Sequence, residues 1–353
     1  MRTLTVGIAA PKPDDGTSYW RAWGPWQRAA QRMRNSETPL HIADLSTISW
    51  PQVMGCDVVF MQRPYTMDHV KAIERVLQCG KPVWVDWDDN LLAVREDNPV
   101  YKLYAPNLEN MEKILRMASV VTVTTETLRK VVFPHNSNVE VLPNAVDFDW
   151  WDRVQVPPRK LDGPVHIMWR GGSTHMDALE AVVDDLSEIA ENYLDTVWTF
   201  LGAVPPPSVK RLMPHDRTRF VEWSHVPECF LRAKALQPDI QFICLQPDVF
   251  DMCKSNIGRI EAALCGAVCV CPNWSHWNGI GTFQYDPSES SKAFAKALTT
   301  AIDMQPEARQ KLAEEALTNV RSEFALDHWN KHRMDILRKI IEKPLKMNVS
   351  TGS

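Results

Sequence analysis

Short apolar stretches alternate with longer amphipathic stretches along almost the whole chain, and no other feature constrains the fold as strongly. In the first half, this pattern predicts helices at residues 19–34, 67–79, 108–117 and 126–132, and strands at 4–9, 57–61, 81–86, 119–123 and 139–142. Alternating strands and helices favour a parallel sheet that helices cover on both faces. The sequence therefore predicts a doubly wound α/β fold.

A Pro- and Gly-containing linker at residues 150–164 divides the chain into two such halves. After it, strands are predicted at 165–169, 197–201, 219–222, 240–245 and 267–271, helices at 176–192, 208–213, 227–236 and 256–265, and a helical tail from 289 to 339. The 353 residues also match the length of about two domains. We therefore predict Rossmann-like domains at 1–156 and 157–325, a helix at 326–342 and a disordered tail at 343–353.

Charge and cysteine content limit the classes of function. The net charge of -5 excludes a generally basic nucleic-acid-binding protein. Residues 1–36 hold six Lys and Arg against two Asp, which makes either a solvated helix face or a docking surface for an anionic substrate. The eight cysteines form no CxxC pair and no zinc-type spacing, which fits a reducing cytoplasm. No stretch is long and apolar enough for a transmembrane helix, so we expect no integral membrane segment.

Polar side chains follow two predicted strands of the first half, at the ends where doubly wound sheets bind ligands. Gly16 permits a tight turn before helix amides that can face an anion, and a plain turn explains it equally well. Asp86 ends the third predicted strand, and Asp88 and Asp89 follow it within three positions. Such acids are not buried unpaired, so we expect them at the edge of a binding site or as a helix cap. We predict no metal site.

Arg170 and the turn after it suit a phosphate group. Arg170 supplies a forked cation, and Gly171, Gly172 and Ser173 form a turn into the next predicted helix. A strand, a Gly-Gly turn and a helix N-terminus together predict a cradle for a diphosphate. The alternative is an ordinary turn with an arginine on the surface.

A second segment of this half suits a nucleotide. Lys254 and Ser255 open a predicted helix whose N-terminus attracts anions. Glu261 lies about two turns further along, among small and apolar residues, where a carboxylate needs a partner. A ribose diol would serve, and the alternative is a structural ion pair with Arg259 or Lys254.

Tryptophan is frequent, with 14 residues, and three of them gather near the basic N-terminus. Trp20, Trp23 and Trp26 surround Arg21 in the sequence. Indole rings stack on sugars or exposed bases, and arginine contacts phosphate, so this segment is a candidate acceptor site. The alternative is that these side chains are buried against the sheet.

Taken in order along the chain, these segments resemble GT-B glycosyltransferases. Glu261, Gly266 and Val268 match the donor-site segment of the retaining group with a Glu-x7-Glu motif, whereas Cys253 stands where its first Glu would be. Lys254, Ser255 and Glu261 instead resemble a "KS-x5-E" variant found in phage and bacterial proteins. Further segments resemble family segments in the same order: Arg170 with its two glycines, and residues 57–63, 83–89, 120–128 and 141–147.

The resemblance implies two Rossmann-like domains that face a cleft, with a C-terminal helix that crosses back to the first. It implies metal-independent transfer of a hexose or pentose from a nucleoside diphosphate sugar, with no further cofactor. The implied roles are leaving-group stabilisation by Arg170 and Lys254, base catalysis by Asp88 if the reaction inverts, donor binding by Gly16, Gly171, Gly172, Ser173, Ser255 and Glu261, and acceptor binding by Trp20, Arg21, Trp23, Asp86 and Asp89.

Two features of the function stay open on the sequence. The acceptor is a hydroxymethylated base of phage DNA, a glycan or a lipid. A nucleotide-sugar epimerase and a non-catalytic nucleotide-sugar-binding protein are the alternatives to a transferase. The sequence names neither the stereochemical outcome nor the oligomeric state.

Overall fold

The computed structural model describes residues 2–47, 49–157, 159, 161–226 and 228–342, which form two compact units. Unit 1 contains residues 2–92, 103–145 and 326–342, and unit 2 contains 93–102 and 146–325. Unit 1 therefore takes its residues from both ends of the chain, and unit 2 includes a short segment from within the first half. The predicted disordered tail at 343–353 lies outside the described residues.

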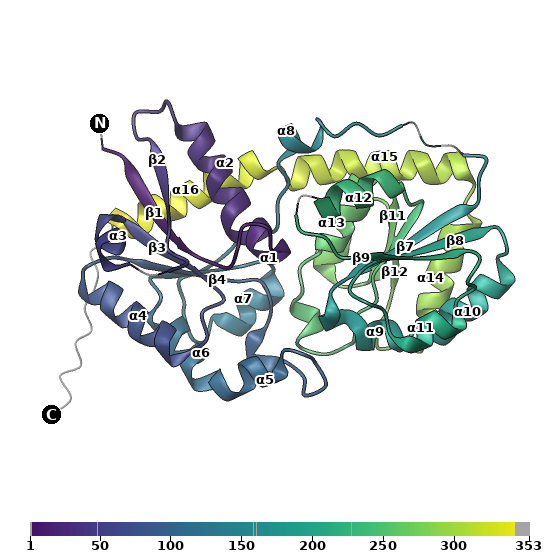
Figure 1. Cartoon of the computed structure of the whole chain (residues 1–353), viewed down its shortest axis with the longest axis horizontal. Coiled ribbons are helices and arrows are strands. Elements are labelled where there is room, and N and C mark those ends of the chain that lie inside the picture. The colour runs from purple at the N-terminus through teal and green to yellow at the C-terminus, as the bar shows by residue number, and fades with distance from the viewer. Residues whose placement is uncertain (1, 48, 158, 160, 227, 343–353) are drawn as a thin grey trace. The chain divides into compact units, whose positions relative to one another are not determined.

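The described part of unit 1 holds six parallel strands in the order β2-β1-β3-β4-β5-β6. Figure 1 labels β1, β2, β3 and β4 of this sheet. The strands are β1 (Leu4–Ala9), β2 (Leu40–Asp44), β3 (Val58–Gln62), β4 (Val83–Trp87), β5 (Val120–Val123) and β6 (Val139–Val141). The helices are α1 (Gly16–Ser18), η1 (Tyr19–Trp23), α2 (Gly24–Met33), α3 (Trp50–Gly55), α4 (Met67–Gln78), η3 (Ala105–Asn107), α6 (Leu108–Met117), α7 (Glu126–Val132) and α16 (Leu326–Glu342). Two short helices, η2 (Leu91–Ala93) and α5 (Tyr101–Tyr104), flank the segment that belongs to unit 2.

The described part of unit 2 repeats this architecture, with six parallel strands in the order β12-β11-β10-β7-β8-β9. The strands are β7 (Val165–Gly171), β8 (Thr196–Gly202), β9 (Thr218–Glu222), β10 (Ile240–Phe242), β11 (Val268–Pro272) and β12 (Thr282–Tyr285). The helices are α8 (Phe148–Trp151), η4 (Ser173–His175), α9 (Met176–Glu180), α10 (Val183–Asn192), α11 (Pro207–Leu212), α12 (Glu228–Leu236), η5 (Asp251–Cys253), α13 (Ile257–Leu264), η6 (Ser275–Trp277), α14 (Ser291–Asp303) and α15 (Pro306–Glu323). None of the described helices is long and apolar enough to cross a membrane.

Strands of unit 2 bury side chains on both faces of the sheet. In β7, Ile167 and Trp169 belong to a core that includes residues of α10 and α14, whereas Met168 packs with Cys229 of α12. Successive side chains of a strand point to opposite faces, so helices cover both faces. A sheet covered in this way needs nearly continuous apolar strands, which is the pattern that the sequence shows. The predicted doubly wound α/β fold is confirmed.

The last helix, α16, completes the core of unit 1. Leu337 is fully buried and belongs to the same cluster as Trp26 of α2 and Trp84 of β4. At the start of the helix, Asp327 accepts two hydrogen bonds from Arg28, at 2.9 and 3.0 Å. Burial alone would raise the pKa of Asp327, but the hydrogen bonds from Arg28 and Arg32 outweigh it, so this pKa lies below its ordinary value. The helix is therefore fixed to α2 by apolar packing and by a pair of charged hydrogen bonds.

The structure corrects the single helix predicted at 19–34. This region contains a short helix α1, a π-helical turn η1 and then α2. The Gly24 amide donates to the Tyr19 carbonyl oxygen, and a Cβ atom at Gly24 would lie 2.7 Å from that oxygen. Since only glycine leaves room for this carbonyl, Gly24 makes the π turn possible.

Other predicted elements differ at sheet edges and at helix breaks. The sequence analysis missed β2 and β12, which are edge strands with partly exposed side chains and therefore no long apolar run. The helix predicted at 176–192 is divided into α9 and α10, and the tail is divided into α14, α15 and α16. Pro306 lies in the first turn of α15, where it starts a helix instead of interrupting one.

Truncation of Leu337 should destabilise unit 1, because α16 closes its core. We expect Leu337→Ala to lower the free energy of unfolding by about 2–5 kcal/mol, the range for a buried leucine. Leu108→Ala is the control, since this side chain on α6 is 40% exposed and should cost much less. Urea unfolding followed by tryptophan fluorescence measures both. Equal losses for the two variants would contradict the packing role of α16.

Candidate active site

In unit 2, the order of the strands changes direction between β7 and β10. β7 pairs with β8 on one side and with β10 on the other. The strands that follow β8 and β10 are therefore added at opposite edges of the sheet. Ligands of doubly wound sheets bind at such a switch point, outside the carboxyl ends of the strands. Arg170 is the next-to-last residue of β7, and the loop after β10 carries Lys254 and Ser255. The predicted donor residues of unit 2 thus lie at the position that the topology favours, whereas Gly16 belongs to unit 1.

Arg170 and Glu261 form a buried ion pair. Arg170 Nη1 donates to Glu261 Oε2 at 2.6 Å, and the side chains are 11% and 5% exposed. The guanidinium also lies 5.4 Å from the ring centre of Trp223 and 5.6 Å from that of Phe230. Arg170, not Arg259 or Lys254, is therefore the partner of Glu261. Arg259 instead pairs with Glu323 of α15.

This pair leaves polar atoms without hydrogen bonds. Glu261 Oε1 and Arg170 Nε are both buried and have no hydrogen-bond partner among the residues that the structure describes. Burial raises the pKa of Glu261, and the charge of Arg170 opposes that shift. A buried carboxylate and guanidinium with unused hydrogen-bonding capacity can bind a diol and an anion without any change in the sheet.

The turn after Arg170 combines one required glycine with two exposed residues. A Cβ atom at Gly171 would lie 2.4 Å from the Trp169 ring, so this position needs glycine for packing. Gly172 and Ser173 are exposed, and the Ser173 side chain does not cap the helix that follows. The turn therefore presents open backbone beside Arg170 but no serine cap.

Lys254 and Ser255 lie between the short helix η5 and α13. Lys254 is almost fully buried, with Nζ 4.4 Å from the ring centre of Phe250 and 3.9 Å from Asp251 Oδ1. Ser255 is half-buried, and Asn256 is the N-cap residue of α13, without a capping hydrogen bond from its side chain. Burial raises the pKa of Asp251, and Lys254 opposes that shift.

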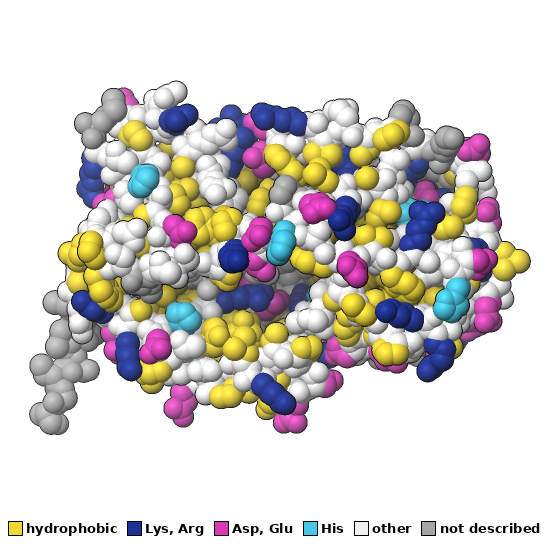
Figure 2. Space-filling view, viewed as in Figure 1, with side chains coloured by type: hydrophobic (Ala, Val, Ile, Leu, Met, Phe, Trp, Pro, Cys, Tyr) yellow, Lys and Arg dark blue, Asp and Glu magenta, His cyan; other side chains and the backbone are white. Residues whose placement is uncertain are grey.

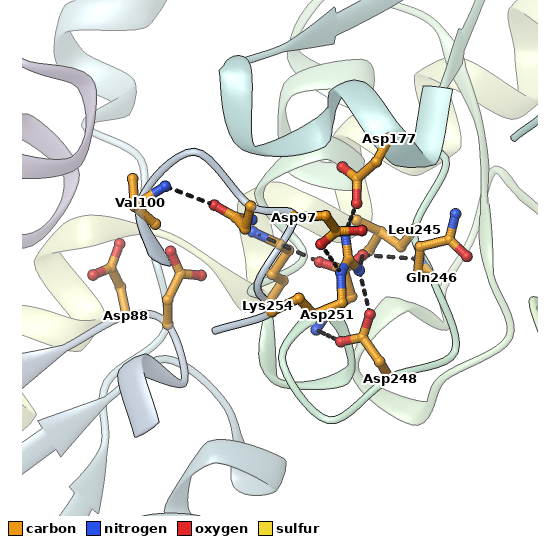
Figure 3. Close-up of polar contacts among 12 residues, drawn as sticks. Asp88, Asp97, Val100, Asp177, Leu245, Gln246, Asp248, Asp251 and Lys254 are labelled. Carbon is orange, nitrogen blue, oxygen red and sulfur yellow. Dashed lines mark hydrogen bonds and ion pairs between the residues drawn. The ribbon is translucent and has the colours of Figure 1, made fainter. Parts of the chain in front are cut away.

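Arg95, which the sequence analysis did not select, joins α9, the helix that follows β7, to the segment after β10. It belongs to the segment Ala93–Lys102 of unit 2 and forms ion pairs with four carboxylates, which converge in Figure 3: Asp97, Asp177, Asp248 and Asp251. Asp177 follows the Gly171-Gly172 turn, and Asp251 lies beside Lys254. No sequence motif marks Arg95, because three of its four partners, Asp177, Asp248 and Asp251, lie about 80 to 155 positions away in the chain.

In unit 1, the turn at Gly16 is closed by its own side chains. Asp15 caps α1 and accepts hydrogen bonds from the Ser18 amide at 2.9 Å and the Ser18 hydroxyl at 3.0 Å. One amide at the start of this helical region, that of Ser18, is thus already occupied. Gly16 itself is half-buried.

The predicted acceptor segment around Arg21 is buried. Trp20 and Trp23 are 9% and 5% exposed, and Arg21 is 1% exposed. Arg21 donates from Nε and Nη2 to the two oxygens of Asp86, at 3.0 and 2.8 Å. These side chains are therefore buried against the sheet, which is the alternative given in the sequence analysis. Asp86 does not face solvent and instead accepts hydrogen bonds from Arg21.

Asp88 and Asp89 share the guanidinium of Arg63. Arg63 Nη2 donates to Asp88 Oδ2 at 2.6 Å and to Asp89 Oδ2 at 2.7 Å. Burial raises the pKa of Asp88, Arg63 opposes the shift, and Asp89 adds to it. The side chains of Asp88 and Asp89 are 13% and 21% exposed, so both carboxylates reach solvent after β4.

The described residues contain no group of three or more His, Cys, Asp or Glu side chains arranged to hold a metal ion. Metal independence stays a prediction from the resemblance.

No protein-family model matches the sequence, and no curated protein matches it. Solved structures do match. HepE (Alr3699) from Anabaena, in complex with UDP and glucose, is 12% identical and superposes with a TM-score of 0.66 over 95% of this chain and 99% of that chain. A glycosyltransferase from Rickettsia africae is 11% identical, with a TM-score of 0.67 over 97% and 99% of the two chains. A putative UDP-N-acetylglucosamine 2-epimerase from Listeria monocytogenes is 14% identical, with a TM-score of 0.58 over 96% of each chain.

The chain has the GT-B fold. Its two units each carry a parallel Rossmann-like sheet, and the similarity to the Anabaena and Rickettsia structures extends over nearly the whole length of both partners. The predicted fold class is thus confirmed, while the Glu-x7-Glu group and its "KS-x5-E" variant stay predictions. The GT-B fold also occurs in the Listeria structure, so the fold alone does not separate a transferase from an epimerase.

The Arg170–Glu261 ion pair should show strong energetic coupling. We expect Arg170→Met and Glu261→Gln each to cost about 3–5 kcal/mol, because each leaves one buried charged group without its partner. The double variant should cost clearly less than the sum. Urea unfolding of the four proteins measures the coupling, and additive losses would contradict it.

The same pair predicts an unusual pH dependence in Arg170→Met. Without the cation, the pKa of Glu261 rises further above its value in the unfolded chain. The folded state then binds a proton that the unfolded state releases, so stability is greatest at low pH and falls as pH rises through the folded-state pKa. Unfolding curves of Arg170→Met and the double variant across pH 4 to 8 test this, and parallel curves would contradict it.

Proposed function

We propose that this chain is a glycosyltransferase that moves a sugar from a nucleoside diphosphate sugar to an acceptor hydroxyl. The observation that carries the proposal is the Arg170–Glu261 ion pair at the switch point of unit 2. Its unused Glu261 Oε1 suits a ribose diol, and its guanidinium suits a diphosphate oxygen. UDP is the nucleotide that we would test first, since HepE was solved with UDP and glucose.

The leaving group sets the chemistry that unit 2 must provide. The bond between the anomeric carbon and the diphosphate oxygen breaks, and both bonding electrons go to the diphosphate. Arg170 and Lys254 supply positive charge for it, and the open backbone at Gly172 lies beside Arg170. Charge stabilisation of this kind is the largest contribution that a preorganised site makes to such a step. Ser255 and Ser173 belong to the same proposed donor site.

We assign the acceptor to unit 1, with Asp88 as its general base if configuration inverts. Asp88 accepts the proton of the acceptor hydroxyl while the oxygen of that hydroxyl forms a bond to the anomeric carbon. A base needs a pKa nearer neutrality than that of an ordinary aspartate, and burial moves the pKa of Asp88 in this direction. Asp89 would bind further hydroxyl groups of the acceptor.

Charge distribution favours a glycan or lipid hydroxyl over a base of DNA. Three basic side chains of the N-terminal region are used internally, Arg21 with Asp86 and both Arg28 and Arg32 with Asp327. On the face shown in Figure 2, Lys and Arg side chains are interspersed with Asp and Glu. Polyanion binding needs a continuous basic surface. The phage setting rests on the sequence resemblance, and DNA modification rests also on the basic, Trp-containing segment around Arg21. Cytoplasmic location rests on the free cysteines.

A nucleotide-sugar epimerase is the second candidate, favoured by the similarity to the Listeria structure. An epimerase would change the sugar without any acceptor. Product analysis by NMR separates the two activities, because a transferase releases UDP and a new glycoside. A non-catalytic binding protein would do neither.

Donor binding should depend on Arg170. UDP at 100 times its Kd should stabilise the native protein by about 2.7 kcal/mol and raise its melting temperature. The shift should be largely lost in Arg170→Ala and Glu261→Ala. Arg232→Ala is the control, because this arginine forms an exposed ion pair with Glu228 on α12. An unchanged shift in the Arg170 and Glu261 variants would contradict the proposed donor site.

If the reaction inverts configuration, loss of the Asp88 carboxylate should slow transfer strongly and leave donor binding unchanged. We expect Asp88→Asn to lower kcat by about 10²–10⁴-fold, the usual contribution of a general base, with the UDP thermal shift unchanged. Asp68→Asn is the control, since Asp68 is an exposed carboxylate on α4. Full activity of Asp88→Asn, or a product that retains configuration, would remove Asp88 from the role of base.

A further inference from the structure

Arg63 has an uncommon backbone conformation at the carboxyl end of β3. Its φ angle is 47°, and among the described non-glycine residues only Gln237, at 46°, shares the left-handed region. The Arg63 amide donates to the Asp86 carbonyl oxygen at 2.9 Å, which extends the pairing of β3 with β4 by one residue. Left-handed backbone is unfavourable for residues with a Cβ, so the neighbouring contacts must hold Arg63 in it.

The side chain of Arg63 supplies those contacts. The guanidinium donates from Nε and Nη2 to both oxygens of Asp88, and Nη2 also reaches Asp89 at 2.7 Å. Tyr104 of α5 lies against the same group: burial raises the pKa of its phenol, and its hydrogen bond with Arg63 opposes that shift. A forked pair of hydrogen bonds fixes both the position and the plane of a carboxylate.

The cluster has one more negative charge than positive. Two carboxylates face one guanidinium, and the three side chains are between 13% and 24% exposed. The groups that act on Asp88 are Arg63 after β3, Asp89 beside it and Arg21 of η1, with Tyr104 of α5 next to Arg63. Arg63 and Arg21 favour the charged form of Asp88, whereas Asp89 disfavours it.

β3 also lies at the switch point of unit 1. β1 pairs with β2 on one side and with β3 on the other, so the loop after β3 occupies the position where such sheets bind ligands. Arg63 is the first residue of that loop. An uncommon backbone conformation at a ligand-binding position points to a functional role.

We propose that Arg63 is a positioning residue for Asp88. Arg63 holds the Asp88 carboxylate in one orientation and keeps it charged against the repulsion of Asp89. The importance of Arg63 for catalysis rests on the proposed function, in which Asp88 is the base. The effect of Arg63 on Asp88 does not rest on that function, because it exists in the protein without substrate. The two ideas can therefore be tested separately.

The test is the titration of the Asp88 carboxylate in the whole protein. Aspartate labelled with ¹³C at the carboxyl carbon is followed by NMR from pH 3 to 8, and the signal missing from Asp88→Asn identifies Asp88. Arg63→Gln removes the favourable cation, so the midpoint should move to higher pH by about 1 unit. Asp89→Asn removes the like charge, so the midpoint should move to lower pH. Arg63→Lys should lie close to the natural protein.

Opposite shifts in these two variants support the proposal, because a general loss of structure would not move the midpoint in two directions. An unmoved midpoint in Arg63→Gln, or shifts of the same sign, would overturn it. If Arg63→Gln does not fold, the Asp89→Asn and Arg63→Lys pair carries the test: the proposal then requires the lower midpoint in Asp89→Asn, and its absence overturns it.

Turnover measurements address the proposed function separately. If Asp88 is the base, the acidic limb of the kcat/KM profile should follow the NMR midpoints, upward in Arg63→Gln and downward in Asp89→Asn. The assay is hydrolysis of UDP-glucose. If the pH profile of kcat/KM does not shift with the NMR midpoints, Asp88 does not act as the base. That outcome would leave the positioning of Asp88 by Arg63 intact.

Discussion

A buried ion pair between Arg21 and Asp86 organises unit 1. Arg21 links three segments, since it also donates to the Leu142 carbonyl oxygen at 2.6 Å and to Asn144. Asp86 in turn accepts from Thr122 of β5 at 2.6 Å. This network joins η1 to the carboxyl ends of β4 and β5 and to the loop after β6. With Asp86 held inside, the chain after β4 carries Asp88 and Asp89 to the accessible edge of the sheet.

The buried ion pair of unit 2 has a different character. The carboxylate of Asp86 has hydrogen bonds at both oxygens, whereas Glu261 Oε1 and Arg170 Nε have none from the described part of the chain. A pair whose oxygens all have hydrogen bonds holds the fold together, because removal of one partner leaves a buried charge. In an unsaturated pair, the buried atoms without hydrogen bonds lower the stability of the free protein. A ligand that supplies the missing hydrogen bonds restores that stability. Two similar pairs of residues therefore serve structure in one unit and, by our proposal, binding in the other.

The sequence revealed most of the fold because parallel strands buried on both faces need apolar runs that are easy to recognise. It failed where burial is one-sided or where a single contact decides the conformation. β2 and β12 are edge strands with mixed burial, and the π turn depends on the close approach of the Tyr19 carbonyl to Gly24. Trp20 and Trp23 were compatible both with a stacking surface and with a core, and only the structure shows that they are buried.

The candidate site was partly readable for the same reason. Arg170 and Glu261 lie in recognisable local patterns, but their pairing joins residues 91 positions apart, which no pattern could show. The sequence places Arg63 directly after an apolar strand, yet its importance comes from a backbone angle and from two carboxylates in another loop. The acids after β4 were visible as a cluster because charge in a short segment needs an explanation. The arginine that controls them was hidden, because a single arginine after a strand needs none.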